Sequence, residues 1–503
     1  MAAVTSGELL VERALQEYKE ASETERKVEV EERLSHYQDD YRDLVYLALR
    51  KCFVKEPSVF MKPMIDDSIN VFKYVINQQY NLYQEEPKRE ALVGTKPDDR
   101  FNEIQNSIQY DAIMDKAQKL AGAATGVALY VVPEKDTKSI RIDIVTPDHL
   151  TTIQDPTNPS EALAIIFEVN LEDSVFTSGT QLTGIAGSTG IGEEIRYFVY
   201  WDVFGNHMMF DSHLRKADIA DNPENKNPFT DPDRPGRTLL PFVICTPSYV
   251  PGAIWDKTTG RNLMSSNTQI AVMGTLLNYY SKMQSFKQPY IKGNVKVNMT
   301  DEMLSDPSVI WQILGEGVEV GTLDMQNNIE AFQRVLDAKI ERALNQEGLA
   351  LADFKKTGSE ATGYALKIKR IPLEEKRCEQ EKFWKLYETE LFELIRVVNN
   401  NQFPDKPINP TAEFVIEFGQ QGILNSPAEQ IQIDTWEISN GVRSVIDIIA
   451  ERRGVDEVEA RAIYQKNLAD KAARVQAAPM TFNLGAEPDD DEEPVSPAGT
   501  VAN

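Results

Sequence analysis

The first quarter of the chain carries apolar residues at helical spacing. From residue 7 to about 53, apolar positions recur every three or four residues among many Glu and Arg, which predicts helix. A second helix is expected after Pro63, over 64–84, because a proline followed by acidic residues marks a helix start. The segment "EALVGTKPDD" ends that pattern, and a further helix is predicted over about 101–124.

After Gly126 the apolar period changes from helical to strand-like. The runs "VALYVVPEK", "SIRIDIVTP", "ALAIIFEVN" and "IRYFVYWDVF" are rich in β-branched and aromatic residues and are separated by Asp, Pro, Asn and Gly. They predict an antiparallel sheet of four or five strands, with 177–194 as a flexible connection between two of them. A proline-rich loop over 221–237 leads into the apolar run "TLLPFVICTP", where Cys245 is expected to be an inert buried thiol.

Two amphipathic helices follow, over about 266–285 and 328–347, with short strands and turns between them over 290–325. Twenty helical residues span about 30 Å, so the two helices and the inserted module predict a stalk with a tip. Their apolar stripes include residues expected to pack the stalk: Ile270, Leu277, Phe332, Leu336 and Ile340.

The segment after the stalk is unusually cationic for this chain. Between positions 355 and 370 a single acidic residue, Glu360, stands among five cations: Lys355, Lys356, Lys367, Lys369 and Arg370. A helical pattern begins at Tyr364, and Pro372 is expected to kink or break it because proline lacks the backbone N–H. The simplest interpretation is a solvated helix face; the alternative is a loop and helix that touch phosphates lightly.

The long pattern beyond Pro372 predicts core rather than a binding site at Phe383, Trp384, Tyr387, Leu391 and Leu394. A strand is expected at "EFVIEFGQ" and a helical unit over about 426–476. The last residues, "AEPDDDEEPVSPAGTVAN", are acidic and contain proline, which predicts disorder.

Composition changes this picture in two ways. The chain has 503 residues and a net charge of −26, which argues against a continuous basic groove around nucleic acid. It favours contact with basic surfaces, or a lumen that a polyanion passes without sticking. Three scattered cysteines, an early charged N-terminus and no long apolar run predict a protein folded in a reducing cytoplasm, without a membrane segment.

Sequence signatures of common chemistry were sought as well. No P-loop, HExxH or GxSxG motif occurs, and the four histidines are far apart in sequence. We therefore expect no cofactor, no metal site and no catalytic residue, and a structural rather than enzymatic role. Carboxylates that meet only in the fold leave a metal-dependent nuclease as the less favoured alternative.

At the cationic segment the chain resembles the portal proteins of tailed bacteriophages. "SEATGYALKIKRIPLEEK" is similar to the stretch in which the family's tunnel loop enters its long kinked tunnel helix. "VTPDHLTTIQDP" resembles a wing segment, "RTLLPFVIC" the strand toward the stem, and "SNGVRSVIDIIAERRGVDEVEARAIY" the crown. The resemblance covers about residues 40 to 475, and the shared order of these motifs carries most of it. The loop at 177–194, the tail after 476 and the long N-terminal helix have no counterpart identified in the family.

The resemblance implies an α+β subunit with a mixed wing, a two-helix stem, a small α/β clip, a long kinked tunnel helix and a helical crown. The implied boundaries are wing 1–262, stem helix 263–285, clip 286–327, stem helix 328–350, tunnel loop and kinked helix 351–402, wing return strand 403–425, crown 426–476 and disordered acidic tail 477–503. In such a ring the stem residues would pack against neighbouring subunits.

The resemblance also implies a function. Portal proteins form a ring of about twelve subunits at one capsid vertex, assembled in the host cytoplasm and carried in the virion. Double-stranded DNA enters through the ring, driven by the large terminase, and later leaves through it. The five cations would face DNA in the tunnel, while Trp311, Glu316 and Glu319 of the clip would dock terminase and head-completion or adaptor proteins.

Major capsid and scaffolding proteins would be further partners of such a ring. Two alternatives remain: Trp311 could be clip core, and the protein could be another ring-forming virion or tail-assembly protein.

Overall fold

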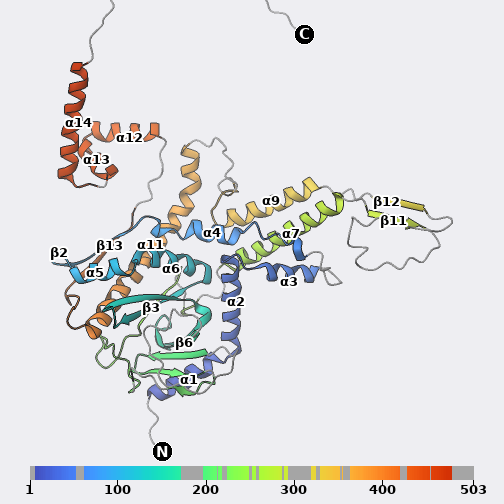
Figure 1. Cartoon of the computed structure of the whole chain (residues 1–503), viewed down its shortest axis with the longest axis horizontal. Helices are drawn as coiled ribbons and strands as arrows, with labels where there is room; N and C mark the ends of the chain where they lie inside the picture. Colours follow the sequence, from blue (N-terminus) through green and yellow to red (C-terminus); the bar gives the residue numbers. More distant parts are fainter. Residues whose placement is uncertain are drawn as a thin grey trace, which may run out of the picture. The chain divides into compact units, whose positions relative to one another are not determined.

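The computed structural model describes most of the chain in two compact units, residues 1–421 and 422–503 (Figure 1). The described residues are 6–52, 62–170, 196–211, 213–217, 222, 224–248, 252–255, 260–285, 288–292, 319–323, 329–351, 354, 363–419, 427–453 and 455–477. The connection at 177–194 and the acidic tail from 478 onward lie outside them. Helices and strands mix throughout the first unit, which confirms the α+β class.

Helices make up much of the first unit. They are α1 (Ser6–Tyr18), α2 (Ala21–Tyr37), α3 (Arg42–Cys52), α4 (Val71–Gln79), α5 (Asp99–Ser107), α6 (Tyr110–Ala124), α7 (Arg261–Ser285), α9 (Ile329–Gln346) and α11 (Gly363–Gln402), with short 3₁₀ turns at Lys62–Met64, Leu82–Gln84 and Pro147–His149. The helices expected over 266–285 and 328–347, and the helix expected to begin near Tyr364, are confirmed as helices.

The three N-terminal predictions gave helices that were too long. The expected helix over 7–53 is three helices, and one break falls where Asp39 adopts a left-handed backbone (φ 65°). The helix expected over 64–84 is only α4, because Asn70 caps its start by accepting a hydrogen bond from the Lys73 N–H. Similarly, left-handed Gln109 (φ 52°) divides the helix expected over 101–124 into α5 and α6.

The strands that the structure describes form four antiparallel sheets. The strands are β1 (Lys88–Val93), β2 (Lys96–Pro97), β3 (Val127–Glu134), β4 (Ser139–Val145), β5 (Leu150–Gln154), β6 (Ala162–Asn170), β7 (Arg196–Asp202), β8 (His207–Phe210), β9 (Lys216–Ala217), β10 (Phe242–Cys245), β11 (Gln288–Lys292), β12 (Glu319–Leu323) and β13 (Glu413–Glu417). Their orders are β5-β6-β7-β8-β9, β10-β3-β4, β13-β1-β2 and β11-β12. The four predicted runs are confirmed as strands, but they belong to two sheets.

The largest apolar core lies where α6 and α11 pack on the β10-β3-β4 sheet (Figure 1). It contains Trp384, Leu391 and Phe392 of α11, all with no exposed surface, and Cys245 of β10. The prediction that Phe383, Trp384, Tyr387, Leu391 and Leu394 are core is therefore confirmed, with Phe383 partly buried at the edge. Cys245 is buried, as expected.

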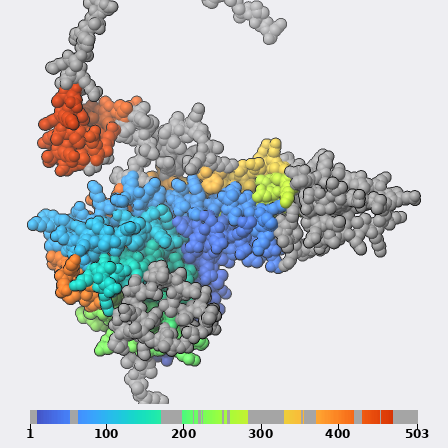
Figure 2. All heavy atoms as spheres, viewed as in Figure 1, coloured from blue at the N-terminus to red at the C-terminus, as the bar shows by residue number. Residues whose placement is uncertain are grey.

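Helices α7 and α9 form an antiparallel hairpin. Tyr280 near the end of α7 packs edge-on against Phe332 near the start of α9, with ring centroids 5.8 Å apart. Further along, the Lys339 ammonium donates a hydrogen bond of 2.5 Å to the Gln269 side chain. Helix α7 lies beside α3 and α4 as well, and in Figure 2 its yellow-green surface and the yellow surface of α9 adjoin the blue N-terminal helices.

The second unit contains α12 (Pro427–Ser439), α13 (Val445–Arg453) and α14 (Glu457–Ala477). The helical unit expected over 426–476 is confirmed. Among its described side chains only Ala460 is a fully buried apolar residue, whereas Ile431, Trp436 and Val458 are more than half exposed.

Candidate functional site: the start of the long helix and its supports

The candidate site is the amino-terminal part of α11, and the rest of that helix is firmly held in the core. This part of the helix has one continuous apolar face, with fully buried side chains at spacings of three, four and seven. They are Trp384, Leu391, Phe392, Ile395 and Val398. Forty residues of α-helix span about 60 Å, so one element connects this core to the cationic segment.

A buried ion pair fastens the middle of α11 to strand β1. The Arg89 guanidinium donates to both carboxylate oxygens of Glu388, at 2.8–3.1 Å, and neither side chain is exposed. Arg89 also pairs with Asp111 of α6, and the Tyr83 hydroxyl donates to Glu388 at 2.9 Å. Burial by itself would lower the pKa of Arg89, but the Glu388 charge outweighs it and raises that pKa.

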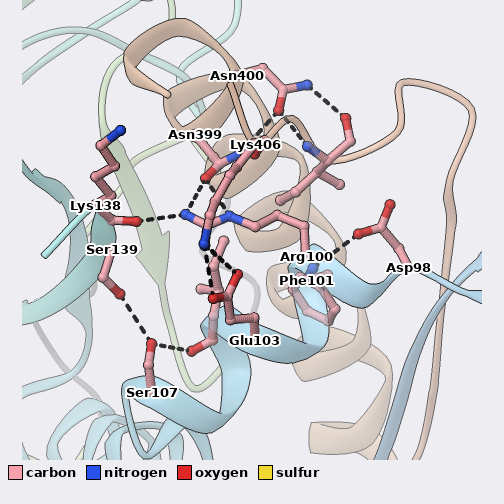
Figure 3. Close-up of polar contacts among 12 residues, drawn as sticks. Asp98, Arg100, Phe101, Glu103, Ser107, Lys138, Ser139, Asn399, Asn400 and Lys406 are labelled. Carbon is pink, nitrogen blue, oxygen red and sulfur yellow. Dashed lines mark hydrogen bonds and ion pairs between the residues drawn. The ribbon is translucent and has the colours of Figure 1, made fainter. Parts of the chain in front are cut away.

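The carboxyl end of α11 is held by polar contacts to α5 and the following loop (Figure 3). The Arg100 guanidinium donates to the Asn399 side chain at 3.0 and 3.2 Å and to the Lys138 carbonyl at 2.7 Å. The Lys406 ammonium pairs with Glu103 at 3.1 Å. These contacts fix the direction of the helix end.

The amino-terminal part of α11 contacts the turn that follows α9 and the helix α4. We call these contacts, made by Pro372 and Lys376 with Gly348, Glu347 and Gln79, the clasp. Gly348, in the turn after α9, has φ +75°, and a Cβ placed on it would lie 3.0 Å from the Cβ of Pro372. One turn further along α11, the Lys376 ammonium donates to the Gln79 side chain at 2.5 Å and lies 3.8 Å from Glu347. Burial lowers the pKa of Lys376, against the opposing effect of Glu347.

Pro372 does not break α11. The helix runs through it from Gly363 to Gln402, so the expected break is wrong, while the kink stays a prediction. Proline removes only one intrahelical hydrogen bond, and Pro372 itself lies at an exposed position of the helix.

Three of the five predicted cations, Lys367, Lys369 and Arg370, lie in the first two turns of α11. The helical backbone places Lys367 and Arg370, three residues apart, on one face. The structure describes only their backbone, and Lys355 and Lys356 lie outside the described residues. Whether the five cations face a channel therefore stays a prediction.

The predicted stem residues all lie at the hairpin, and three of them are covered within one chain. Ile270, Leu336 and Ile340 are buried in a core that they share with α4, and Leu277 and Phe332 are partly buried. Val335, next to Leu336, is 57% exposed, which makes it a large apolar side chain of α9 that is open to an outside partner.

Little of the predicted clip surface is described. Trp311 and Glu316 lie outside the described residues, and Glu319 is the first residue of β12, where it is paired with Lys292 of β11. The strands β11 and β12 run antiparallel between the two stem helices in sequence, which agrees with the short strands expected there.

Other kinds of site were sought in the same described ranges. There, no group of three or more His, Cys, Asp or Glu side chains is arranged to hold a metal ion. Within those same limits, no helix combines the length and apolar character needed to cross a bilayer.

The clasp is the feature that sequence reasoning missed. Its one signal in the sequence is Gly348, placed directly after a periodic helix as a helix-terminating glycine would be. The Arg89–Glu388 pair has no such signal, because its partners are 299 positions apart.

Comparison with known proteins adds nothing to these observations. No family model matches the chain, and no curated protein matches it. A function has to be proposed from the residues and the geometry.

Proposed function

We propose that this chain is the subunit of a bacteriophage-type portal ring. In that role it forms the channel through which double-stranded DNA is packaged and ejected, and the platform on which head-completion or tail proteins dock. The motif order in the sequence is the first support for the proposal.

The observation that carries the proposal is the path of the chain through α7, β11, β12, α9 and α11. Helices α7 and α9 form an antiparallel hairpin, and the two-stranded sheet of β11 and β12 is inserted between them in the sequence. After α9 the chain reaches Gly348, which lies against Pro372 of α11. Stem, clip and tunnel helix follow one another in this order in portal subunits. The contact between Gly348 and Pro372 supports the same arrangement, because it joins the hairpin to the helix that begins with the cationic segment.

The charge distribution supports the same role. A chain with a net charge of −26 repels a DNA duplex over most of its surface, so DNA slides rather than binds. Five cations close together in sequence would then make brief, salt-screened phosphate contacts at the narrowest part of the channel. The partners that follow are a large terminase, adaptor, scaffolding and major capsid proteins, and further copies of this chain.

The proposal is tested by the mass of the purified protein in solution. A ring of twelve chains of 56.7 kDa has a mass of about 680 kDa, measurable by mass photometry or sedimentation. A packaging assay with terminase and empty capsid precursors then separates a portal from other ring-forming virion or tail-assembly proteins. A ring that never supports DNA entry in that assay contradicts the portal assignment.

A further inference from the structure

The first unit contains a pocket of about 550 Å³ that the portal role does not use. It lies between the start of β6, strand β10 with the loop that precedes it, and residues 389–394 of α11. Its walls are largely apolar, and the apolar side chains include Leu163, Ile165, Leu239, Leu240, Phe242 and Leu394. A pocket of this size holds a few side chains of a bound peptide.

The pocket carries a marked excess of negative charge. Five carboxylates and two guanidiniums line it. The Arg234 guanidinium donates two hydrogen bonds, of 3.0 and 3.1 Å, to the Glu161 carboxylate. Glu390, by contrast, is an exposed residue whose carboxylate has no hydrogen-bond or ion-pair partner among the residues that the structure describes.

The two carboxylates that α11 contributes to the pocket, Glu390 and Glu393, both have a raised pKa. Partial desolvation at the pocket wall, and then the neighbouring Glu161, raise the pKa of Glu390. Burial also raises the pKa of Glu393; Arg396 opposes that rise and Asp233 adds to it. A cation placed among these groups would relieve the repulsion, and Lys and Arg side chains combine such a cation with an apolar stem.

We propose that this pocket binds a protein segment in which a Lys or Arg lies between apolar residues, supplied by a partner protein. The apolar wall would accept the flanking side chains, and the carboxylates Asp233 and Glu390 would receive the cation. Charge complementarity favours this occupant over a nucleic acid, whose phosphates the carboxylates repel. The inference does not depend on the portal role.

The test is fluorescence polarisation of the full-length protein with the labelled peptide Leu-Arg-Leu-Lys-Leu. The comparison peptides have Gln or Glu in place of both cations. We expect the cationic peptide to bind at least tenfold more tightly than the Gln peptide, and the difference to shrink as salt is raised. The Glu peptide should show no binding.

The decisive variant is Asp233→Asn with Glu390→Gln, which leaves the Glu161–Arg234 and Glu393–Arg396 pairs intact. It should lose at least tenfold in affinity for the cationic peptide while keeping the same unfolding temperature. The matched control, Glu413→Gln with Glu417→Gln on exposed positions of β13, should bind unchanged.

Three results would overturn the proposal. Equal binding of the three peptides, or binding unaffected by the Asp233 and Glu390 substitutions, removes the pocket as a basic-segment site. Loss of ring assembly in that variant would instead assign the pocket to a neighbouring copy of the chain and contradict a separate partner.

Discussion

Gly348 lies directly against Pro372, and the close approach of these two residues ties the turn after α9 to α11. A Cβ on Gly348 would stand 3.0 Å from the proline Cβ, closer than side chains normally pack. The left-handed backbone at Gly348 (φ +75°) is a conformation that other residues adopt only at a cost. The contact joins the α7–α9 hairpin to the segment that carries the cations predicted to face DNA.

Gly348→Ala is therefore expected to destabilise the subunit by about 2 kcal/mol, through the backbone penalty and the displacement of Pro372. The matched control is Gly94→Ala, where φ is +68° but nothing lies within 4 Å. It should cost only the backbone penalty, about 1 kcal/mol. Urea unfolding measures both, and equal losses would show that the Pro372 contact contributes nothing.

The buried ion pair gives a second prediction. Arg89→Met leaves Glu388 without its cation in a fully buried site and should cost about 3–5 kcal/mol. The double variant Arg89→Met with Glu388→Leu removes both charges and should recover a large part of that loss. Unfolding curves of the two variants decide the point, and a double variant less stable than Arg89→Met would contradict it.

Stability should fall in mild acid because of His36. This side chain lies 3.0 Å from the Asn267 amide and 3.3 Å from the Thr268 hydroxyl of α7, and it packs against Tyr41 and Phe72. Burial lowers its pKa from 6.5 to about 4. Between those values the unfolded chain binds a proton that the folded chain does not, so stability is lost as pH falls from about 6.5 to about 4.

The full loss from His36 amounts to about 3 kcal/mol. Urea unfolding across pH 4 to 7 measures it. His36→Gln should reduce the slope of this part of the profile without abolishing it, because burial also lowers the pKa of His207, from 6.5 to about 3. His149→Gln, at a largely exposed position, should leave the profile unchanged. A profile with the same slope in the His36 variant would assign the acid sensitivity to other groups.

The two faces of α9 should respond differently to substitution. Leu336 is buried against α4, and Leu336→Ala should cost about 2–5 kcal/mol of subunit stability. Val335→Asp changes an exposed position, so it should leave the subunit folded but weaken ring assembly if neighbouring stems meet there. Sedimentation of both variants tests this, and normal rings from Val335→Asp would remove this face from the interface.

Neutralising the five cations, Lys355, Lys356, Lys367, Lys369 and Arg370, should leave ring assembly intact and reduce DNA packaging by about tenfold or more, because their phosphate contacts are lost. The matched control is Lys382→Gln with Lys385→Gln, on exposed positions of the same helix, which should package normally. Full packaging by the five-fold variant would remove these residues from the mechanism.

Strong local patterns in the sequence predicted their elements correctly. The β-branched runs of β3, β4, β6 and β7, and the apolar stripes of α7, α9 and α11, gave the right kind of element. Helix breaks at Asp39 and Gln109 were missed because a left-handed residue leaves no periodic signal. The strands β1 and β2 were missed because β1 depends on pairing with β13, more than 300 residues later.

The candidate site was predictable only in part. The cluster of cations and the start of α11 near Tyr364 could be seen from composition and spacing. The supports of that helix could not, since Glu388 and Lys376 meet Arg89 and Gln79 through the tertiary fold. In the proposed ring, where the cations point would also depend on neighbouring subunits, which one chain's sequence does not contain.

The central claim, that this chain forms a portal ring, is tested most directly by electron microscopy of the purified protein, averaged along any ring axis. The account predicts rings of about twelve subunits with an open channel wide enough for duplex DNA. Particles that remain single subunits at high concentration, with scaffolding protein present, would contradict it.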